Sequence, residues 1–156
     1  MLGTPATGGT VTEGTGRLWL SATGTTQTKF IIYADASGTP GALLATSDEV
    51  NLSATTEAAV SFPFSGAQQI VVVANTGYWI GEVWKDPGTP GVIISRDNTG
   101  TKRYENTLTY PTLPDPFGAP SGTLSGPMDA FITYTETVAG GAVNTSFKTL
   151  LGVGNI

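Results

Sequence analysis

Residues 30–50 read FIIYADASGTPGALLATSDEV, and this stretch decides the fold class. It begins with Phe30 to Ala34, a segment rich in the aromatic and β-branched residues that favour strands. Ser37 to Gly41 then combines glycines, which tolerate positive φ, with a proline that fixes φ near the turn value. A second apolar segment follows from Leu43. The stretch therefore predicts two β-strands joined by a tight chain reversal.

Further short strands are predicted on both sides of this hairpin. Residues 17–22 alternate between apolar and polar side chains, which is typical of a half-buried strand. Residues 57–64 alternate as well, and Pro63 indicates a sheet edge because proline has no N–H to donate. Residues 69–74 form a continuous β-branched run, which predicts a strand covered on both faces. Other strands are expected over residues 78–84, 92–97, 102–105 and 128–135.

The spacing of these segments predicts an all-β fold. No segment of about twelve or more residues has a helical period, and about nine strands recur at intervals of roughly ten residues. We therefore expect an antiparallel β-sandwich of the jelly-roll type over residues 16–136, with extended N- and C-terminal arms. Residues 1–15 are rich in glycine and threonine and poor in large apolar groups, so they are predicted to form the N-terminal arm. Residues 137–156 are predicted to form the C-terminal arm.

A proline-rich segment interrupts this pattern between residues 109 and 127. It carries Pro111, Pro114, Pro116, Pro120 and Pro127. This composition excludes regular structure and predicts a long ordered loop. Loops of this length often lie beside functional sites, so the segment is a candidate location for function.

Composition narrows the possible chemistry. At 156 residues the chain is expected to form one domain, and it has neither cysteine nor histidine. Disulfides, thiolate catalysis, zinc-thiolate sites and imidazole ligands are therefore excluded. We expect no cofactor and no bound metal, since no calcium-loop motif is present either.

Charge and hydropathy bear on the partners. The formal charge is −5, and the seven basic residues are scattered along the chain, so nucleic acid is not an expected partner. No apolar run approaches the roughly 20 residues that a membrane helix needs, so no membrane partner is expected. Residues 1–5 also lack the basic start and apolar core of a secretion signal.

Two motifs carry a family resemblance. The first is the strand Ile32 to Asp35 with its return over residues 41–47, and the second is residues 77–81 with the downstream segment 115–118. Together they resemble the jelly-roll domains of tail and other virion proteins of phages that infect actinobacteria. The match spans about residues 17–135, and the module also resembles carbohydrate-binding-like domains of bacterial surface proteins.

This chain differs from the domains that it resembles at its N-terminal side, and the difference bears on assembly. Domains of this type usually carry an additional strand ahead of residues 17–22, where this chain has its Gly/Thr-rich segment. One sheet edge is therefore expected to be open, and residues 144–156 are a candidate strand donor to another chain. The alternative is that this tail folds back on its own subunit. The candidate assembly residues are the apolar side chains Phe147, Leu150, Leu151, Val153 and Ile156.

Aromatic residues supply the candidate ligand site. Trp84, Tyr104 and Tyr110 lie near strand ends and the proline-rich loop, where they could stack on sugar rings. The alternative is that they pack beneath the loop. Trp79 and Tyr78 are adjacent on a strand, so one should face the core, and burial is expected for Trp79.

An enzymatic function is not expected. A glycosidase needs paired carboxylates, and the carboxylates nearest the aromatic residues are Glu82, Asp86, Asp97 and Asp115, which the sequence does not bring together. Without histidine a serine nucleophile would need a lysine base, and the chain has no Ser-x-x-Lys motif. No glycine-rich loop joins a strand to a helix to hold phosphate.

The sequence therefore favours a non-enzymatic phage virion structural protein, a minor tail protein or another surface-exposed component, that uses its sandwich for assembly and display. Its expected location is the virion, and its expected partners are other virion proteins and copies of itself in a homo-oligomer. The alternatives are a capsid decoration protein and an extracellular carbohydrate-binding module that binds a host cell-wall glycan.

Overall fold

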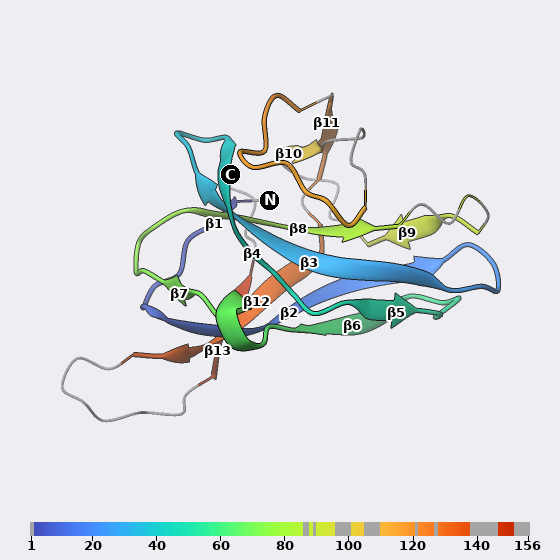
Figure 1. Cartoon of the computed structure of the whole chain (residues 1–156), viewed down its shortest axis with the longest axis horizontal. Helices are drawn as coiled ribbons and strands as arrows, with labels where there is room; N and C mark the ends of the chain where they lie inside the picture. The colour runs from blue at the N-terminus through green and yellow to red at the C-terminus, as the bar shows by residue number, and fades with distance from the viewer. Residues whose placement is uncertain are drawn as a thin grey trace.

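The chain folds as two antiparallel β-sheets packed face to face (Figure 1). The computed structural model describes residues 2–85, 88, 90–95, 101–104, 110–120, 122–126, 128–137 and 147–151. The elements are β1 (Leu2–Gly3), β2 (Gly9–Leu20), β3 (Thr26–Asp35), β4 (Pro40–Thr46), β5 (Val50–Leu52), β6 (Ala58–Pro63), the 3-10 helix η1 (Gly66–Gln68), β7 (Val71–Val72), β8 (Tyr78–Trp84), β9 (Val92–Ile94), β10 (Thr101–Tyr104), β11 (Gly122–Ser125), β12 (Ala130–Glu136) and β13 (Phe147–Leu151). The predicted all-β sandwich is confirmed, and jelly-roll connectivity stays a prediction.

Each sheet has a simple strand order. Sheet A, with five strands, runs β1-β8-β3-β4, and β5 also pairs with β3. Sheet B, with six strands, runs β13-β12-β2-β6, and β7 and β9 also pair with β2. The strands β10 and β11 pair with each other as a separate ribbon, which lies on the side of sheet A that faces away from sheet B (Figure 1).

The hairpin in residues 30–50 forms as the sequence predicts. β3 and β4 pair around a turn in which Ser37 and Gly38 have positive φ values of 57° and 84°. The Asp35 carboxylate accepts a hydrogen bond from the Gly38 N–H at 3.0 Å, which stabilises the turn from within. The returning strand is divided into β4 and β5, and both parts pair with β3.

The predicted N-terminal arm over residues 1–15 is wrong. β1 pairs with β8, and β2 lies inside sheet B between β12 and β6. Gly14, one of the glycines that suggest an arm, lies where the opposite sheet comes close: a Cβ at this position would lie 2.5 Å from the Phe30 ring. A glycine inside a strand often marks such a close approach, and here it admits a large side chain from the facing sheet.

Two other predictions about local structure are corrected. Residues 69–74 do not form a doubly covered strand, because only Val71–Val72 are in β7 and the side chain of Val71 is 62% exposed. The proline-rich segment is not free of regular structure, since its residues 122–125 form β11. The predicted edge at Pro63 agrees with the place of β6 at the end of the sheet B path.

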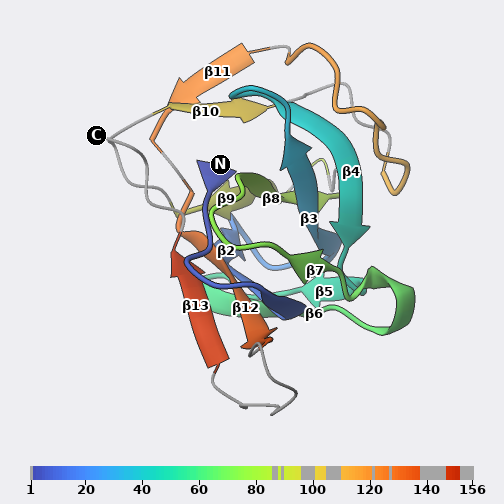
Figure 2. The ribbon, with the colours of Figure 1, turned by 90° about the vertical axis from the view of Figure 1, so that its left-hand side faces the viewer.

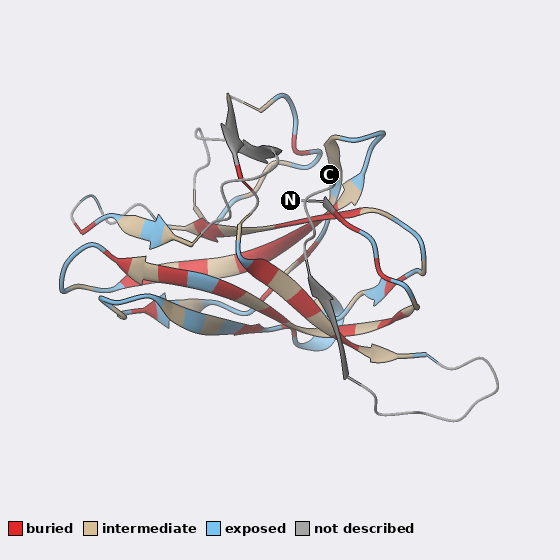
Figure 3. Cartoon of the chain, turned by 180° about the vertical axis from the view of Figure 1, so that it is seen from behind, coloured by how far each residue is buried: buried red, intermediate tan, exposed pale blue. Residues whose placement is uncertain are grey.

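The main hydrophobic core lies between the sheets, and buried residues recur along the strands (Figure 3). Phe30 from sheet A packs on Phe62 with ring centroids 5.7 Å apart and on Phe64 at 6.4 Å. Alternation along β2 places Leu18 and Leu20 in this core, as the sequence predicts. Burial of these apolar side chains is the main stabilising contribution to the sandwich.

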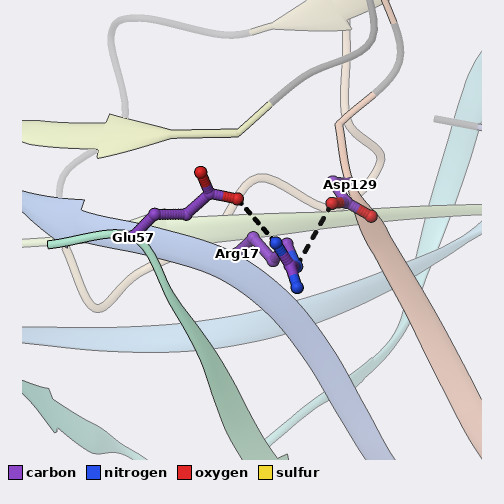
Figure 4. A network of polar contacts seen from close by, with 3 residues as sticks. All are labelled: Arg17, Glu57 and Asp129. Atoms are coloured by element: carbon purple, nitrogen blue, oxygen red, sulfur yellow. Dashed lines mark hydrogen bonds and ion pairs between the residues drawn. The ribbon is translucent and has the colours of Figure 1, made fainter.

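A polar network crosses the outer surface of sheet B. Arg17 Nη1 donates to Glu57 Oε1 at 2.7 Å, and Arg17 Nε lies 3.4 Å from Asp129 Oδ2 (Figure 4). The hydrogen bond to Glu57 and the negative charges of both carboxylates raise the pKa of Arg17. Because all three side chains are well exposed, solvent screens these interactions, and their contribution to stability is small.

Candidate functional site

Residues 110–120, here called the strap, cover the outer face of sheet A, the face turned away from sheet B. Figure 2 shows this loop in orange running beside β4. The strap places Phe117 against Tyr33 with the two rings edge to face and their centroids 5.2 Å apart. The cluster beneath it, here called the strap cluster, contains Ile31, Tyr33, Trp79, Val83 and Phe117, with Leu43, Tyr110 and Leu113 packed around them. The protein thus has a second hydrophobic core outside the sandwich.

Polar contacts fasten the strap to the sheet. The Tyr33 hydroxyl donates to the carbonyl of Pro114 at 2.9 Å. Burial, and secondly the negative charge of Asp115, raise the pKa of Tyr33 to about 12, so the hydroxyl remains a donor further into the alkaline range than an ordinary tyrosine. A hydroxyl on the sheet thereby binds the backbone of the strap.

The strap also occupies the exposed edge of β4. The Leu43 N–H donates to the Asp115 carboxylate at 2.9 Å, and the Phe117 N–H donates to the Gly41 carbonyl at 2.9 Å. Further along the strand, the Thr46 N–H donates to the side chain of Gln68 at 2.9 Å. Unpaired backbone groups on an edge strand invite pairing with other chains, and these contacts satisfy them within the chain.

Tyr110 holds the start of the strap. Its hydroxyl donates to Glu49 Oε2 at 2.7 Å, while Glu49 Oε1 accepts from the Gln27 amide at 2.6 Å. Burial is the main cause that raises the pKa of Tyr110, and the hydrogen bond to Glu49 adds to it. Tyr110 therefore packs beneath the loop, as one of the two alternatives for the aromatic residues predicts.

Asp35 links the strap cluster to the hairpin turn. Its Oδ1 accepts a hydrogen bond from Trp79 Nε1 at 2.8 Å and another from the Gly38 N–H at 3.0 Å. Trp79 is buried, as expected, but so is Tyr78, because Tyr78 faces the inter-sheet core and Trp79 faces the strap. Both faces of β8 are therefore covered at this position.

Two of the three candidate stacking residues, Trp84 and Tyr110, are not brought together. Trp84 is in register with Thr28, a fully buried residue, and alternation from Val83 places Trp84 on the inner face of sheet A. Tyr110 lies on the outer face, so these two rings do not share a platform. The backbone of Tyr104 lies in β10, and its side chain is outside the described part of the chain.

Of the candidate carboxylates, Glu82 and Asp115 also lie on opposite sides of sheet A. Glu82 is in register with Phe30 on the inner face, where its oxygens are buried and a Cβ at Gly16 would collide with Oε1. Asp115 lies on the strap at the outer side and bonds to β4. Asp86 and Asp97 lie outside the described residues.

Among the residues that the structure describes, no group of three or more acidic side chains is arranged to hold a metal ion. No helix in the described part of the chain is long and apolar enough to cross a membrane.

The candidate assembly residues fall on the last described strand and beyond it. Phe147, Leu150 and Leu151 belong to β13, whose backbone pairs with β12 of the same chain. The tail thus folds back on its own subunit over residues 147–151, and strand donation to another chain stays a prediction. Val153 and Ile156 lie outside the described residues.

Sequence reasoning missed the residues that fasten the strap. The sequence places Tyr33 and Asp35 in a strand and Asp115 among the candidate carboxylates, and all three lie in the motifs of the family resemblance, but none of this predicts that they fasten the strap. One signal was present, because Asp115 precedes Pro116 in a proline-rich segment, and Asp-Pro sequences favour turns whose carboxylate can bind backbone N–H groups.

Comparison with known proteins supplies no relative: no family model, curated protein or solved structure matches this chain.

Proposed function

We propose that this chain is a non-enzymatic structural component of a phage virion, a minor tail protein or another surface-exposed component that uses its β-sandwich for assembly and display. The observation that supports this proposal best is the fastening of the strap. Four polar side chains beside the strap, those of Tyr33, Asp35, Glu49 and Asp115, are bonded to the backbone or to aromatic residues of the same chain. Such contacts hold a long surface loop in a fixed shape.

A fixed surface loop suits display. The strap is anchored by its own cluster and by bonds from Tyr33 and Asp115. Because the loop is already ordered, contact with a partner does not have to include the entropy cost of ordering it. The low proportion of charged residues, 12% of the chain, is consistent with a surface that meets other subunits. The capsid decoration protein is the alternative within this class.

The proposal is tested by locating the protein on particles. Antibodies raised against the purified chain are used for immunogold labelling of purified particles of the phage that encodes it, with mass spectrometry of the same particles. We expect the chain in the particles and the label on the tail. Label on the head would favour decoration of the capsid, and absence of the chain from particles would overturn the proposal.

The carbohydrate-binding alternative is separated by a second measurement. Binding to host cell-wall fractions is measured for the wild-type chain and for Trp84→Ala and Tyr110→Ala. Because these rings lie on opposite faces of sheet A, we expect no binding that both substitutions abolish. Wall binding that is lost in both variants, with both still folded by circular dichroism, would favour the carbohydrate-binding module.

A further inference from the structure

The outer face of sheet B, the face turned away from sheet A, carries a partly exposed tryptophan. Leu18 and Leu20 lie in the inter-sheet core, so alternation along β2 places Trp19 on the outer face. Its register partner Ile93 is on the same face, because the two neighbours of Ile93 in β9 pack against that core. The side chain of Ile93 is 38% exposed. Apolar surface is therefore open to solvent at this end of β2.

The indole N–H of Trp19 bonds to none of the residues that the structure describes. The buried indole of Trp79, in contrast, donates to the Asp35 carboxylate at 2.8 Å. A tryptophan that is covered by protein usually has a partner for this donor. Trp19 therefore offers a ligand both an apolar ring and an N–H donor.

The Arg17 network lies directly beside this tryptophan. Arg17 comes two residues before Trp19 and shares its face of β2. Glu57 directly precedes β6, whose first residue pairs with Leu18, so Glu57 comes level with Trp19. Asp129 completes the network from the side of β12 (Figure 4). A ring, a guanidinium group and two carboxylates are thus gathered on one open part of the sheet.

The charges of this network select the class of ligand. Two carboxylates lie 2.7 and 3.4 Å from the guanidinium group of Arg17, so a phosphate or carboxylate ligand would meet like charge. The three side chains are 42–51% exposed, so the donor and acceptor positions that the network leaves unused face solvent. Such positions suit the hydroxyl groups of an uncharged ligand, which both donate and accept hydrogen bonds.

A sugar ring matches both parts of this surface. A pyranose has an apolar C–H face that stacks on an aromatic ring, and its hydroxyl groups bond to carboxylates and guanidinium groups. A peptide that adds as a strand instead needs a free sheet edge, and at Leu18 the strand β2 is paired on both sides, with β6 and with β9. The surface therefore favours a saccharide over an added strand.

A second aromatic residue on the same face indicates the length of the ligand. Phe131 is the register partner of Thr15, and it points outward because its neighbours in β12, Ala130 and Ile132, lie in the inter-sheet core. Thr15 and Trp19 are separated by about 13 Å along β2. One sugar ring does not reach both aromatic residues, whereas an oligosaccharide does.

We propose that the outer face of sheet B binds an uncharged oligosaccharide that lies along β2. One ring stacks on Trp19, the Arg17 network bonds to hydroxyl groups, and a further ring reaches Phe131. This site is separate from the strap cluster, and it goes beyond the assembly function proposed above. The chain can bind a sugar whether or not it belongs to a virion, so the particle labelling and the test below can fail independently.

The test follows the indole N–H signals of the three tryptophans in NMR spectra of the isotope-labelled full chain. The probes are cellohexaose, chitohexaose and mannohexaose, each at up to about 5 mM. We expect at least one of them to shift the Trp19 signal, which Trp19→Phe assigns, while the signal of Trp79 beneath the strap stays in place. If no hexasaccharide shifts the Trp19 signal, the proposal is wrong.

Substitutions then locate the site by calorimetric titration with the hexasaccharide that binds. Trp19→Ala should raise the dissociation constant at least about tenfold, and Phe131→Ala should raise it by a smaller factor. Val71→Ala is the matched control, since it removes exposed apolar surface from a strand that pairs further along β2, and it should change nothing. Circular dichroism establishes that each variant is folded. A folded Trp19→Ala variant with unchanged affinity would overturn the site, and an unchanged Phe131→Ala variant would contradict the course of the ligand along β2.

The charge argument has its own test. A hyaluronan hexasaccharide carries carboxylates that would face Glu57 and Asp129, so it should bind at least about tenfold more weakly than the neutral sugar. Tighter binding of the acidic sugar would refute the assigned ligand class. If Trp19→Ala prevented incorporation into particles while no sugar bound, the face would be a protein contact, and the proposal would fall.

Discussion

The two hydrophobic cores of this protein are built from different kinds of chain segment. The core between the sheets is made by strands on both sides, and its largest members, such as Phe30 and Phe62, are fully buried. The strap cluster has a strand on one side and an irregular loop on the other, and Phe117 is 7% exposed. The first core is held by burial and ladders of backbone bonds, whereas the second also needs individual side-chain hydrogen bonds.

The two cores should therefore contribute differently: the inter-sheet core to the stability of the whole fold, and the strap cluster to the shape of the surface loop. The inter-sheet core should determine whether the chain folds, because it contains the larger buried apolar area shared by both sheets. The strap cluster should open locally at a lower free energy, since a loop has fewer bonds that must break together. Substitutions in the two cores should therefore differ in both size and extent.

The largest effect is expected from Phe30→Ala in the inter-sheet core. The substitution removes a fully buried ring that packs on Phe62 and Phe64, so it should lower the free energy of unfolding by about 3–5 kcal/mol. Urea denaturation followed by circular dichroism measures the change. The control is Val71→Ala at an exposed position, which should stay within about 0.5 kcal/mol of the wild type. Similar losses in both variants would contradict the placement of this core.

A smaller effect is expected from adding a methyl group to the strand that faces Phe30. Gly14→Ala places a Cβ 2.5 Å from the Phe30 ring, and the resulting overpacking should cost about 1–3 kcal/mol. Gly91→Ala is the matched control, because the nearest atom to its Cβ would lie 4.0 Å away. The double variant Gly14→Ala/Phe30→Leu should lose less stability than the sum of its single variants. Strict additivity in urea denaturation would show that the two positions do not press on each other.

The strap cluster should respond more weakly and more locally. Phe117→Ala removes the ring that packs on Tyr33 and should cost about 1–2 kcal/mol, because a loop can settle into the space more easily than a sheet can. Amide exchange should accelerate in residues 110–120 and β4 and stay unchanged in β2 and β12. An acceleration that spreads evenly over both sheets would contradict this expectation, because it would show that the two cores open as one cooperative unit.

The smallest effect is a pH dependence that belongs to the strap alone. Below about pH 10 the Tyr33 hydroxyl is protonated in both the folded and the unfolded chain, so its contribution to stability is fully present. Between there and its folded-state pKa of about 12, the unfolded chain releases the proton first, and stability falls as pH rises. Tyr33→Phe should remove this part of the alkaline loss in urea denaturation at about pH 9 and about pH 11. An identical slope in both proteins would rule out Tyr33 as its source.

The sequence predicts strands correctly where apolar and polar side chains alternate along the strand itself. It fails where the residue type at a position is determined by a contact with another strand. Leu18 and Leu20 reveal their inward face by their spacing. Gly14 looks like an arm residue until Phe30 is seen across from it, and Gly16 has no side chain because Glu82 lies across from it, so only the facing sheet explains both glycines. Residues 69–74 look like a buried strand because their apolar character does not tell how much of the run another strand will cover.

The candidate site was predictable only in outline. The prolines between residues 109 and 127 predict an ordered loop, and Tyr110 could be expected to pack beneath it. The loop is 72 residues from the strand that it covers when counted from Asp115 to Leu43, and no local pattern links two such distant segments. The bonds from Tyr33 and Asp115 therefore became visible only in the folded chain.

The central claim, that the strap is fastened to β4 as a separate unit, is tested most directly by amide exchange of the native chain with and without Asp115→Ala. In the wild type, the Leu43 and Phe117 amides should be protected, with an opening free energy below that of the Phe30 and Ile32 amides in β3. In Asp115→Ala, the Leu43 amide should exchange at least about tenfold faster while the β3 amides keep their rates. Leu43 and Phe117 amides that exchange as fast as those of an unstructured peptide in the wild-type chain would contradict the claim.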